Sequence, residues 1–314
     1  MLFAYQIDGR TLRQRAPEDD LADAQWIDLY RPQPAQVDRV TALGIDVPTL
    51  EDMEEIELSN RLYRAGDTEV LTVTLPGLDV EKRRSTGPVA FILTPQRMVT
   101  VRYHTPRPFE TFASHAAAST AGCSTHLHLF LGLVEEIIAR LADLLEADGR
   151  ALDAASHALF EGDGLRGRAL EQRLRDIGQR GEAIGQFRLS LLTLGRALTS
   201  FSLGREKHRL QPLVKARNRD IQSLLVHADF LSSRVAQLTD VALGFVTLEQ
   251  TSASRVLSVV AILFLPPTLV ASVYGMNFAY VPGLAHPHGY LIATALMAGS
   301  ALATYLFCKW KGWL

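Results

Sequence analysis

The feature that most constrains this 314-residue chain is a long segment without charge. No Asp, Glu, Lys or Arg occurs from Val256 to Cys308, although charged residues make up 21% of the sequence. A soluble domain carries charged side chains throughout its surface, so a charge-free segment of this length predicts membrane spans. Residues 256–274 and 290–308 are uncharged runs, each about 28 Å long as a helix and close to the roughly 30 Å hydrocarbon thickness. We therefore expect a membrane protein with a large soluble part.

Basic residues at the ends of the two runs indicate the topology. Arg255 precedes the first run, Lys309 and Lys311 follow the second, and the loop 275–289 between them carries no formal charge. Positive charge collects on the cytoplasmic side of membrane proteins. The sequence thus predicts a multi-pass protein of the cell inner (plasma) membrane, surrounded by membrane lipid, with both termini in the cytoplasm.

Composition excludes several classes of function. The net charge of -2 gives no attraction to nucleic acid, and two cysteines, Cys123 and Cys308, are too few for a disulfide framework or a cysteine zinc cluster. No phosphate-binding loop, nucleophile elbow or HExxH pattern occurs. We expect neither an enzyme nor an organic cofactor.

The soluble part begins with a predicted α/β domain, residues 1–120. Short runs of β-branched and aromatic residues, bounded by Gly, Pro, Asp and Asn, indicate its strands. These predicted strands are residues 2–7, 26–29, 70–75, 89–93 and 98–103. Residues 36–43 and 49–58 predict short helices between them.

A helical stalk region, residues 121–250, follows and leads into the transmembrane region, residues 251–314. Helical patterns cover 125–160, 165–203 and 212–274, and the last of these continues into the first membrane span. The predicted fold class is an α+β membrane protein with an N-terminal α/β cytoplasmic domain, a long helical stalk and two C-terminal transmembrane helices.

An apolar stripe with the alternating three-and-four spacing of a heptad seam runs along the stalk part of the last helix. It consists of Ile221, Leu224, Ala228, Leu231, Val235, Leu238, Ala242 and Phe245. Two interpretations carry equal weight: packing against the two preceding helices of the same chain, or contact between subunits.

A second stripe of small and hydroxyl-bearing residues has the same spacing. Its members are Asp240, Gly244, Thr247, Thr251, Ser254, Ser258, Ala261, Leu265, Thr268 and Ser272. Small residues also favour close helix packing in membranes. A carboxylate repeated around a symmetric mouth, however, gathers cations, so Asp240 favours a pore wall in which Leu265 forms a narrow apolar ring. Two spans cannot enclose a water-filled path, so a pore requires an oligomer.

The end of the first span reads Tyr274-Gly275-Met276-Asn277-Phe278, and here the chain resembles the CorA family of magnesium transporters. FLPPTLVAS before it, LEDMEEIELSNR at residues 50–61 and the basic end KWKGWL are similar to the proteobacterial members. The resemblance implies a funnel-shaped homopentamer that takes up Mg²⁺, with Co²⁺ and Ni²⁺ as further candidates, down the electrochemical gradient. It also implies that Gly275, Met276 and Asn277 form the selectivity filter.

The same resemblance implies regulation by cytoplasmic Mg²⁺ bound between subunits. The matching acidic residues are Glu51 and Asp52, with Asp220 in the stalk. Carboxylates from two chains repel one another until a cation bridges them. Loss of the cation would then loosen the interface and favour opening. From the residues alone, this acidic cluster has the composition of a solvated helix face.

Three positions depart from the family pattern. Gly283 stands where the family commonly has an acidic residue, and Thr251 stands where it often has an Asn ring. His286 and His288 in the outer loop suit zinc or cobalt better than magnesium. The alternatives are therefore a zinc transporter of the ZntB-like type, against which Gly-Met-Asn argues, and a non-conducting membrane-anchored scaffold or sensor.

Overall fold

The computed structural model describes residues 1–16, 18–55, 57, 61–161, 167–202, 209–276 and 288–312. The chain forms two compact units. The first comprises Met1–Asp163 and Arg173–Thr239, and the second comprises Gly164–Gln172 and Asp240–Leu314.

The first unit is built on a seven-stranded sheet, counted over the described residues, with the order β2-β1-β3-β7-β6-β5-β4. Only β3 and β7 pair in parallel; the other neighbours are antiparallel. The strands are β1 (Leu2–Asp8), β2 (Thr11–Gln14), β3 (Trp26–Tyr30), β4 (Leu62–Ala65), β5 (Thr68–Leu78), β6 (Arg84–Leu93) and β7 (Met98–Arg102).

All five predicted strands are confirmed, and the sequence missed β2 and β4. These two are four-residue strands at the two edges of the sheet, and none of their residues is buried. An edge strand needs no apolar face to pair with its neighbour, so it leaves no alternating pattern in the sequence.

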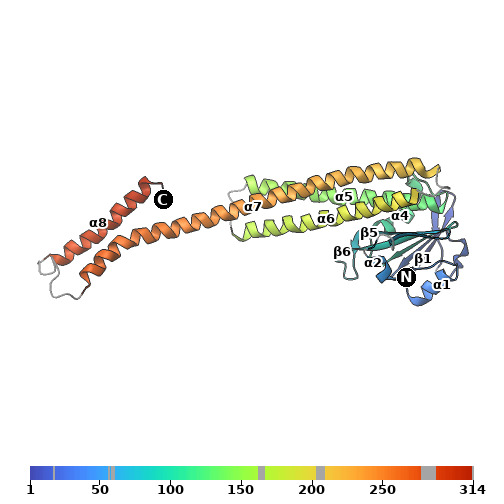
Figure 1. Cartoon of the computed structure of the whole chain (residues 1–314), viewed down its shortest axis with the longest axis horizontal. Helices are drawn as coiled ribbons and strands as arrows, with labels where there is room; N and C mark the ends of the chain where they lie inside the picture. Colours follow the sequence, from blue (N-terminus) through green and yellow to red (C-terminus); the bar gives the residue numbers. More distant parts are fainter. Residues whose placement is uncertain are drawn as a thin grey trace. The chain divides into compact units, whose positions relative to one another are not determined.

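Helices cover both faces of this sheet (Figure 1). On one face lie α1 (Pro34–Thr41) and α2 (Leu50–Glu54), whose Val40 and Met53 join Ile27 in a buried apolar cluster. On the other face α4 (Pro108–His115) and α5 (His126–Glu161) bring aromatic rings onto Trp26 and Phe91. Two one-turn helices, Leu21–Asp23 and Ala116–Ala118, also lie in this unit. The predicted helix at 49–58 is wrong in its extent, because α2 ends at Glu54.

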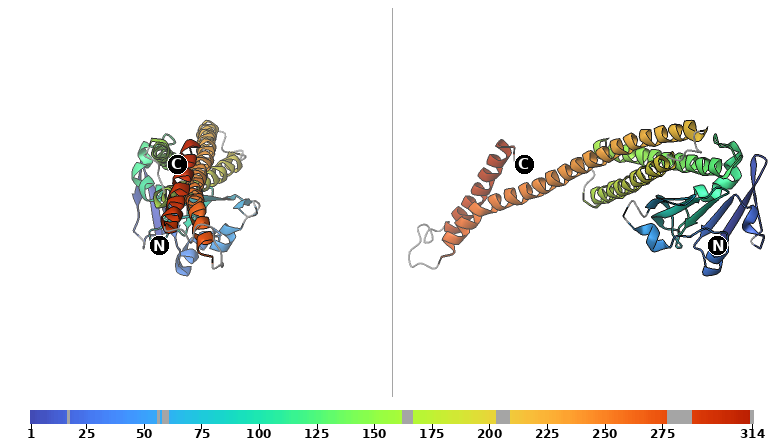
Figure 2. Two further views of the ribbon diagram at one scale, coloured as in Figure 1. Left: turned by 90° about the vertical axis from the view of Figure 1, so that its left-hand side faces the viewer. Right: turned by 45° about the vertical axis from the view of Figure 1, so that its right-hand side comes forward.

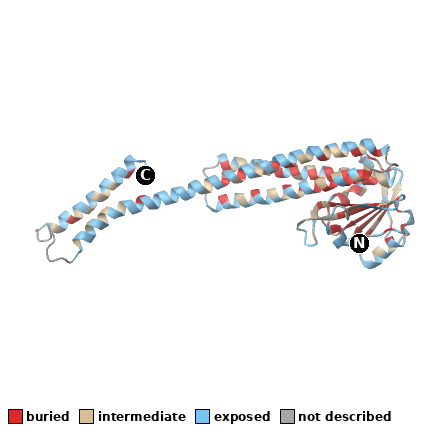
Figure 3. Ribbon diagram, in the orientation of Figure 1, coloured by how far each residue is buried: buried red, intermediate tan, exposed pale blue. Residues whose placement is uncertain are grey.

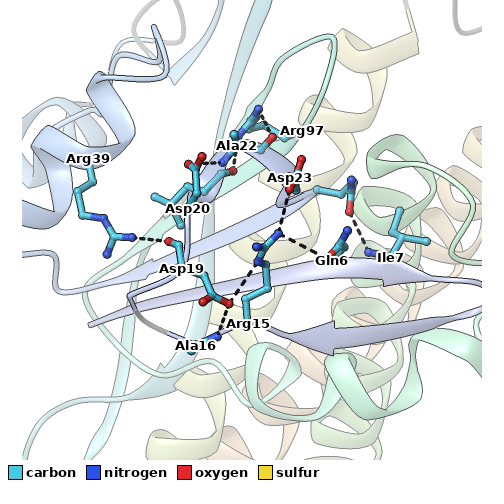
Figure 4. A network of polar contacts seen from close by, with 12 residues as sticks. Gln6, Ile7, Arg15, Ala16, Asp19, Asp20, Ala22, Asp23, Arg39 and Arg97 are labelled. Carbon is cyan, nitrogen blue, oxygen red and sulfur yellow. Dashed lines mark hydrogen bonds and ion pairs between the residues drawn. The ribbon is translucent and has the colours of Figure 1, made fainter.

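A polar network ties the segment between β2 and β3 to the sheet (Figure 4). Arg39 of α1 donates to the Asp19 carbonyl at 2.9 Å, and Arg97 donates to the Leu21 and Ala22 carbonyls at 2.6 and 2.9 Å. Arginine side chains therefore satisfy the backbone of a stretch that lacks strand partners of its own.

The parallel pair β3–β7 is held by a buried ion pair. Arg102 contacts Asp28 at 2.9 Å, and the two side chains are only 4% and 2% exposed. Thr100 donates to the same carboxylate at 2.8 Å, while the Trp26 indole donates to the Thr100 hydroxyl at 3.0 Å. The Arg102 guanidinium also donates to the His104 carbonyl, so both charges are hydrogen-bonded as burial requires.

Three long helices, α5, α6 (Arg168–Ser202) and the first part of α7 (Gln211–Tyr274), lie side by side in the first unit (Figures 1 and 2). Five residues of the predicted apolar stripe lie in this part with their side chains turned into the chain. Ile221, Ala228, Leu231 and Leu238 are buried, and Val235 approaches Gly181 of α6 closely. Packing within the chain, one of the two interpretations of this stripe, is therefore confirmed for the stalk.

The second unit contains the rest of α7 and α8 (Gly289–Trp310), two helices long and apolar enough to cross a membrane. Large apolar side chains such as Phe264, Leu265 and Leu269 are more than half exposed. Most of the ribbon of these two helices has the colour of exposed residues in Figure 3. The helix α7 continues through Pro266 and Pro267. This surface suits lipid or neighbouring helices rather than water.

We predict that Asp28→Ala lowers the free energy of unfolding by about 3–5 kcal/mol, because it leaves the Arg102 charge buried without a partner. Urea denaturation of the purified full-length chain in detergent, followed by circular dichroism, measures the change. Glu81→Ala is the matched control, since it removes an ion pair with Arg83 whose side chains are 62% and 76% exposed, and it should cost under about 1 kcal/mol. Equal losses for the two variants would contradict the prediction.

Candidate functional site

One face of α7 carries the predicted stripe of small and hydroxyl-bearing residues, and every member is exposed in the single chain. These residues are Asp240, Gly244, Thr247, Thr251, Ser254, Ser258, Ala261, Leu265, Thr268 and Ser272. All ten belong to the second unit, so the structure places them on one helix within one body.

The hydroxyl groups of this stripe present acceptors rather than donors. Thr247 donates to the Leu243 carbonyl at 3.0 Å, and Thr251 donates to the Thr247 carbonyl at 2.8 Å. Ser258 makes the same contact one turn back at 2.9 Å. Each hydroxyl hydrogen is thus used inside the helix, and the oxygen lone pairs remain for molecules outside it. Such a surface suits the waters of a hydrated cation, whose hydrogens point outward.

Asp240 stands at the N-terminal end of the stripe. It is exposed and makes no ion pair with any described residue of the chain. A free carboxylate at this position attracts cations. Near it in sequence, Thr251, Ser254 and Ser258 border an open groove of about 750 Å³ that also touches Arg255 and Gly312.

At the C-terminal end of the stripe, Gly275 closes the last turn of α7. Its amide donates to the Ala271 carbonyl at 2.9 Å, and the Met276 amide reaches the Val273 carbonyl at 3.4 Å. A Cβ at position 275 would lie 3.0 Å from the Ala271 oxygen, a tight contact that the neighbouring atoms must relieve by a few tenths of an ångström. Asn277 of the predicted filter and His286 lie outside the described residues; His288 precedes α8 and is exposed.

The predicted regulatory carboxylates do not meet within one chain. Glu51 and Asp52 lie on α2, on one face of the sheet, while Asp220 lies on α7 with the long helices on the other face (Figure 1). Asp52 forms a capping box with Thr49, the N-cap residue of α2: the Thr49 amide and hydroxyl donate to the Asp52 carboxylate at 2.8 and 2.7 Å. The hydrogen bond from the hydroxyl has the larger effect, and together the two hold the pKa of Asp52 below its usual value.

Asp220 already has a cationic partner. Arg217, one turn earlier, contacts its carboxylate at 2.9 Å and reaches Glu135 of α5 at 3.2 Å. Sequence analysis missed Arg217, although its three-residue spacing from Asp220 is the signal for such a pair on a helix. No group of three or more His, Cys, Asp or Glu side chains within the described ranges is placed to hold a metal.

Comparison with known proteins decides the family. The chain matches the family described as CorA-like Mg2+ transporter protein over residues 22–309. It is 34% identical to the magnesium transport protein CorA of Yersinia pseudotuberculosis and 33% identical to that of Escherichia coli, with 100% of each chain covered. The chain belongs to the CorA family. This is a family of transporters and not of enzymes, as the sequence predicted.

Solved structures show the same architecture. The complete CorA magnesium transporter from Methanocaldococcus jannaschii matches with a TM-score of 0.77 and 18% identity, covering 100% of this chain and 99% of that one. The ZntB cytoplasmic domain from Vibrio parahaemolyticus matches over 76% of this chain with a TM-score of 0.58 and 12% identity. The predicted fold class, with its α/β domain, long helices and two apolar C-terminal helices, is confirmed for this CorA-family chain.

Proposed function

We propose that this CorA-family chain transports Mg²⁺ into the cell across the inner membrane. The main support is that the chain matches magnesium transport proteins of this family along its full length. The exposed acceptor face of α7 supports it, because such a face offers hydrogen-bond partners to a hydrated cation. Co²⁺ and Ni²⁺ are candidate further substrates.

The conducting form is a homopentamer in which five α7 helices surround the path. Two apolar helices in one chain leave the acceptor face open, so several chains are needed to enclose it. Residues 1–120 and 121–250 are the cytoplasmic α/β and stalk domains, and 251–314 is the transmembrane domain. The span 256–274 lines the path, 275–289 is the outer loop and 290–308 is the outer ring of helices.

The selectivity filter is the turn of Gly275, Met276 and Asn277. Magnesium gives up its waters reluctantly and prefers oxygen ligands. A ring of neutral Asn277 amide oxygens holds the hydrated ion through its waters, so no dehydration is needed at the entrance. The inside-negative potential supplies about 4.6 kcal/mol per divalent ion per 100 mV, twice the single-charge value. This is sufficient to drive uptake without another energy source.

Cytoplasmic Mg²⁺ closes the path by binding between subunits. Glu51 and Asp52 of one chain meet Asp220 of the next, since within a single chain they lie on opposite faces of the sheet. Arg217 neutralises Asp220 when Mg²⁺ is absent, and the metal competes with this guanidinium for the carboxylate. A rising Mg²⁺ concentration thus shifts the oligomer toward its closed arrangement until the sites are full.

The proposal predicts Mg²⁺ entry into liposomes that hold purified protein, an internal magnesium dye and an inside-negative potential. Asn277→Ala should reduce the rate about tenfold or more, because it removes a ring of hydrogen bonds to a charged, hydrated ion. Zinc entry without magnesium entry would instead assign a zinc transporter. No flux of any divalent ion from verified oligomers would leave a non-conducting scaffold.

A second prediction concerns the geometry behind the filter. Gly275→Ala should slow Mg²⁺ entry, because its Cβ meets the Ala271 oxygen at 3.0 Å and must shift the chain that leads to Asn277. Gly299→Ala on α8 is the matched control, since nothing lies within 4 Å of a Cβ there. In the same liposomes, a rate that falls equally in both variants would argue against a specific role of the turn.

A third prediction concerns regulation. Half-maximal inhibition of uptake occurs at a certain internal Mg²⁺ concentration. Asp220→Asn should raise this concentration by at least about fivefold, because a bridging carboxylate is lost. Asp153→Asn is the control: it also removes a stalk carboxylate paired with an arginine, Arg234 at 2.7 Å, and should leave inhibition unchanged. Uptake rates are measured at a series of internal Mg²⁺ loads. Unaltered inhibition in Asp220→Asn would remove this residue from the regulatory site.

A further inference from the structure

An apolar cluster projects from the stalk part of α7. Val226 is 71% exposed and Phe230, one turn later, is 57% exposed. The His227 ring lies nearly parallel to the Phe230 ring, with their centroids 6.4 Å apart. We name Val226, His227 and Phe230 the stalk knob. Exposed apolar side chains gathered on a helix in the soluble unit, away from the membrane spans, indicate a binding surface.

A groove of about 380 Å³ lies between α6 and α7 in the same unit. Its lining combines four apolar side chains, Leu191, Leu192, Ile221 and Leu225, with four polar ones, Arg196, Thr199, Asn218 and Gln222. A Cβ at Gly195 would meet only Ile221, at 3.5 Å, so the space above this glycine is open. Leu189, 47% exposed, is a further apolar side chain on α6. The groove therefore offers apolar contacts beside polar ones, and its α7 residues, 218–225, directly precede the stalk knob in the sequence.

The two surfaces face different directions. At about 100° per residue, Val226 and Phe230 lie roughly a quarter turn around α7 from Asn218 and Leu225 of the groove. A surface and its complement on different sides of one subunit make a head-to-tail contact, and such contacts close into a ring when the rotation between neighbours leads back to the first subunit. In a small ring, the directions from one helix to its two neighbours also differ by roughly a quarter turn or slightly more.

We infer that the stalk knob of one subunit seats in the α6–α7 groove of the next subunit. The inference rests on the proposed oligomer and assigns the surfaces that hold its stalks together. Val226 and Phe230 lie against Leu189, Leu192 and Leu225 of the neighbour. Aromatic and aliphatic side chains that enter a pocket at the centre of an interface contribute most of its affinity.

Disulfide cross-linking tests this contact in the full-length protein. Both native cysteines are buried and are replaced by alanine in the background chain. Two differently tagged chains are co-expressed, one with Val226→Cys and the other with Leu192→Cys, and are oxidised in the membrane. We expect a cross-linked dimer carrying both tags. A chain with both substitutions should give a ladder of species up to the closed ring.

The controls separate the possible failures. Val226→Cys with Ala147→Cys, an exposed position on α5, should give no dimer; dimers at equal yield would overturn the inference. Dimers formed by Val226→Cys chains alone would place two stalk knobs against each other, and this result would also overturn the inference. Oligomers verified by native mass spectrometry that give no mixed dimer would refute this contact and leave the proposed function standing. A monomer would refute both.

A charge substitution provides an independent readout. Phe230→Lys places an ammonium group beside Arg196 of the groove and should convert the oligomer to smaller species, measured by light scattering in detergent. Because Phe230 is exposed in the single chain, the circular dichroism of the variant should stay unchanged. Retention of the full assembly by Phe230→Lys would contradict the inference.

Discussion

Transfer of a divalent cation from water into hydrocarbon has a prohibitive cost in free energy. A membrane protein that transports such an ion must therefore offer it polar groups or water along its path. Among the described residues, two helices are apolar enough to cross a membrane, and one of them bears hydroxyl oxygens at intervals along one face. Thr247, Thr251 and Ser258 each donate the hydroxyl hydrogen to a carbonyl one turn back. The hydroxyl oxygens therefore keep their lone pairs for partners outside the helix.

The first unit holds the N-terminal part of α7 by packing and by ion pairs. α5 and α6 pack along this part, and three ion pairs, Arg180–Asp148, Arg188–Asp229 and Arg234–Asp153, join the helices along their length. The sheet of the same unit is pinned at β3–β7 by the hydrogen-bonded pair of Asp28 and Arg102. Because this pair is buried, whereas the pairs between the helices are partly exposed, its loss has the larger cost in stability.

Much of this fold was predictable from the sequence. The five strands with buried apolar residues and the uninterrupted α7 were all predictable, because alternation and helical periodicity reflect burial. β2 and β4 were missed because edge strands bury little, and α2 was predicted too long because a run of glutamates is compatible with helix wherever packing permits. The sequence predicted Glu51, Asp52 and Asp220 as candidate metal ligands. Their proximity could not be tested, since one chain places them on separate helices, α2 and α7. The Arg217 partner of Asp220 was missed, although its spacing on a predicted helix would have indicated the pair.

The two prolines inside α7 give the outer part of this helix a particular mechanical property. Pro266 and Pro267 have no backbone N–H, so the carbonyls of Ile262 and Leu263 have no donor one turn ahead. The Thr268 hydroxyl spans the next two carbonyls, those of Phe264 and Leu265, at 2.7 and 2.9 Å. Bending at this point therefore has two fewer backbone hydrogen bonds to oppose it than bending elsewhere in the helix. The part of α7 beyond these prolines can thus change its tilt at a lower cost in free energy than an uninterrupted helix could.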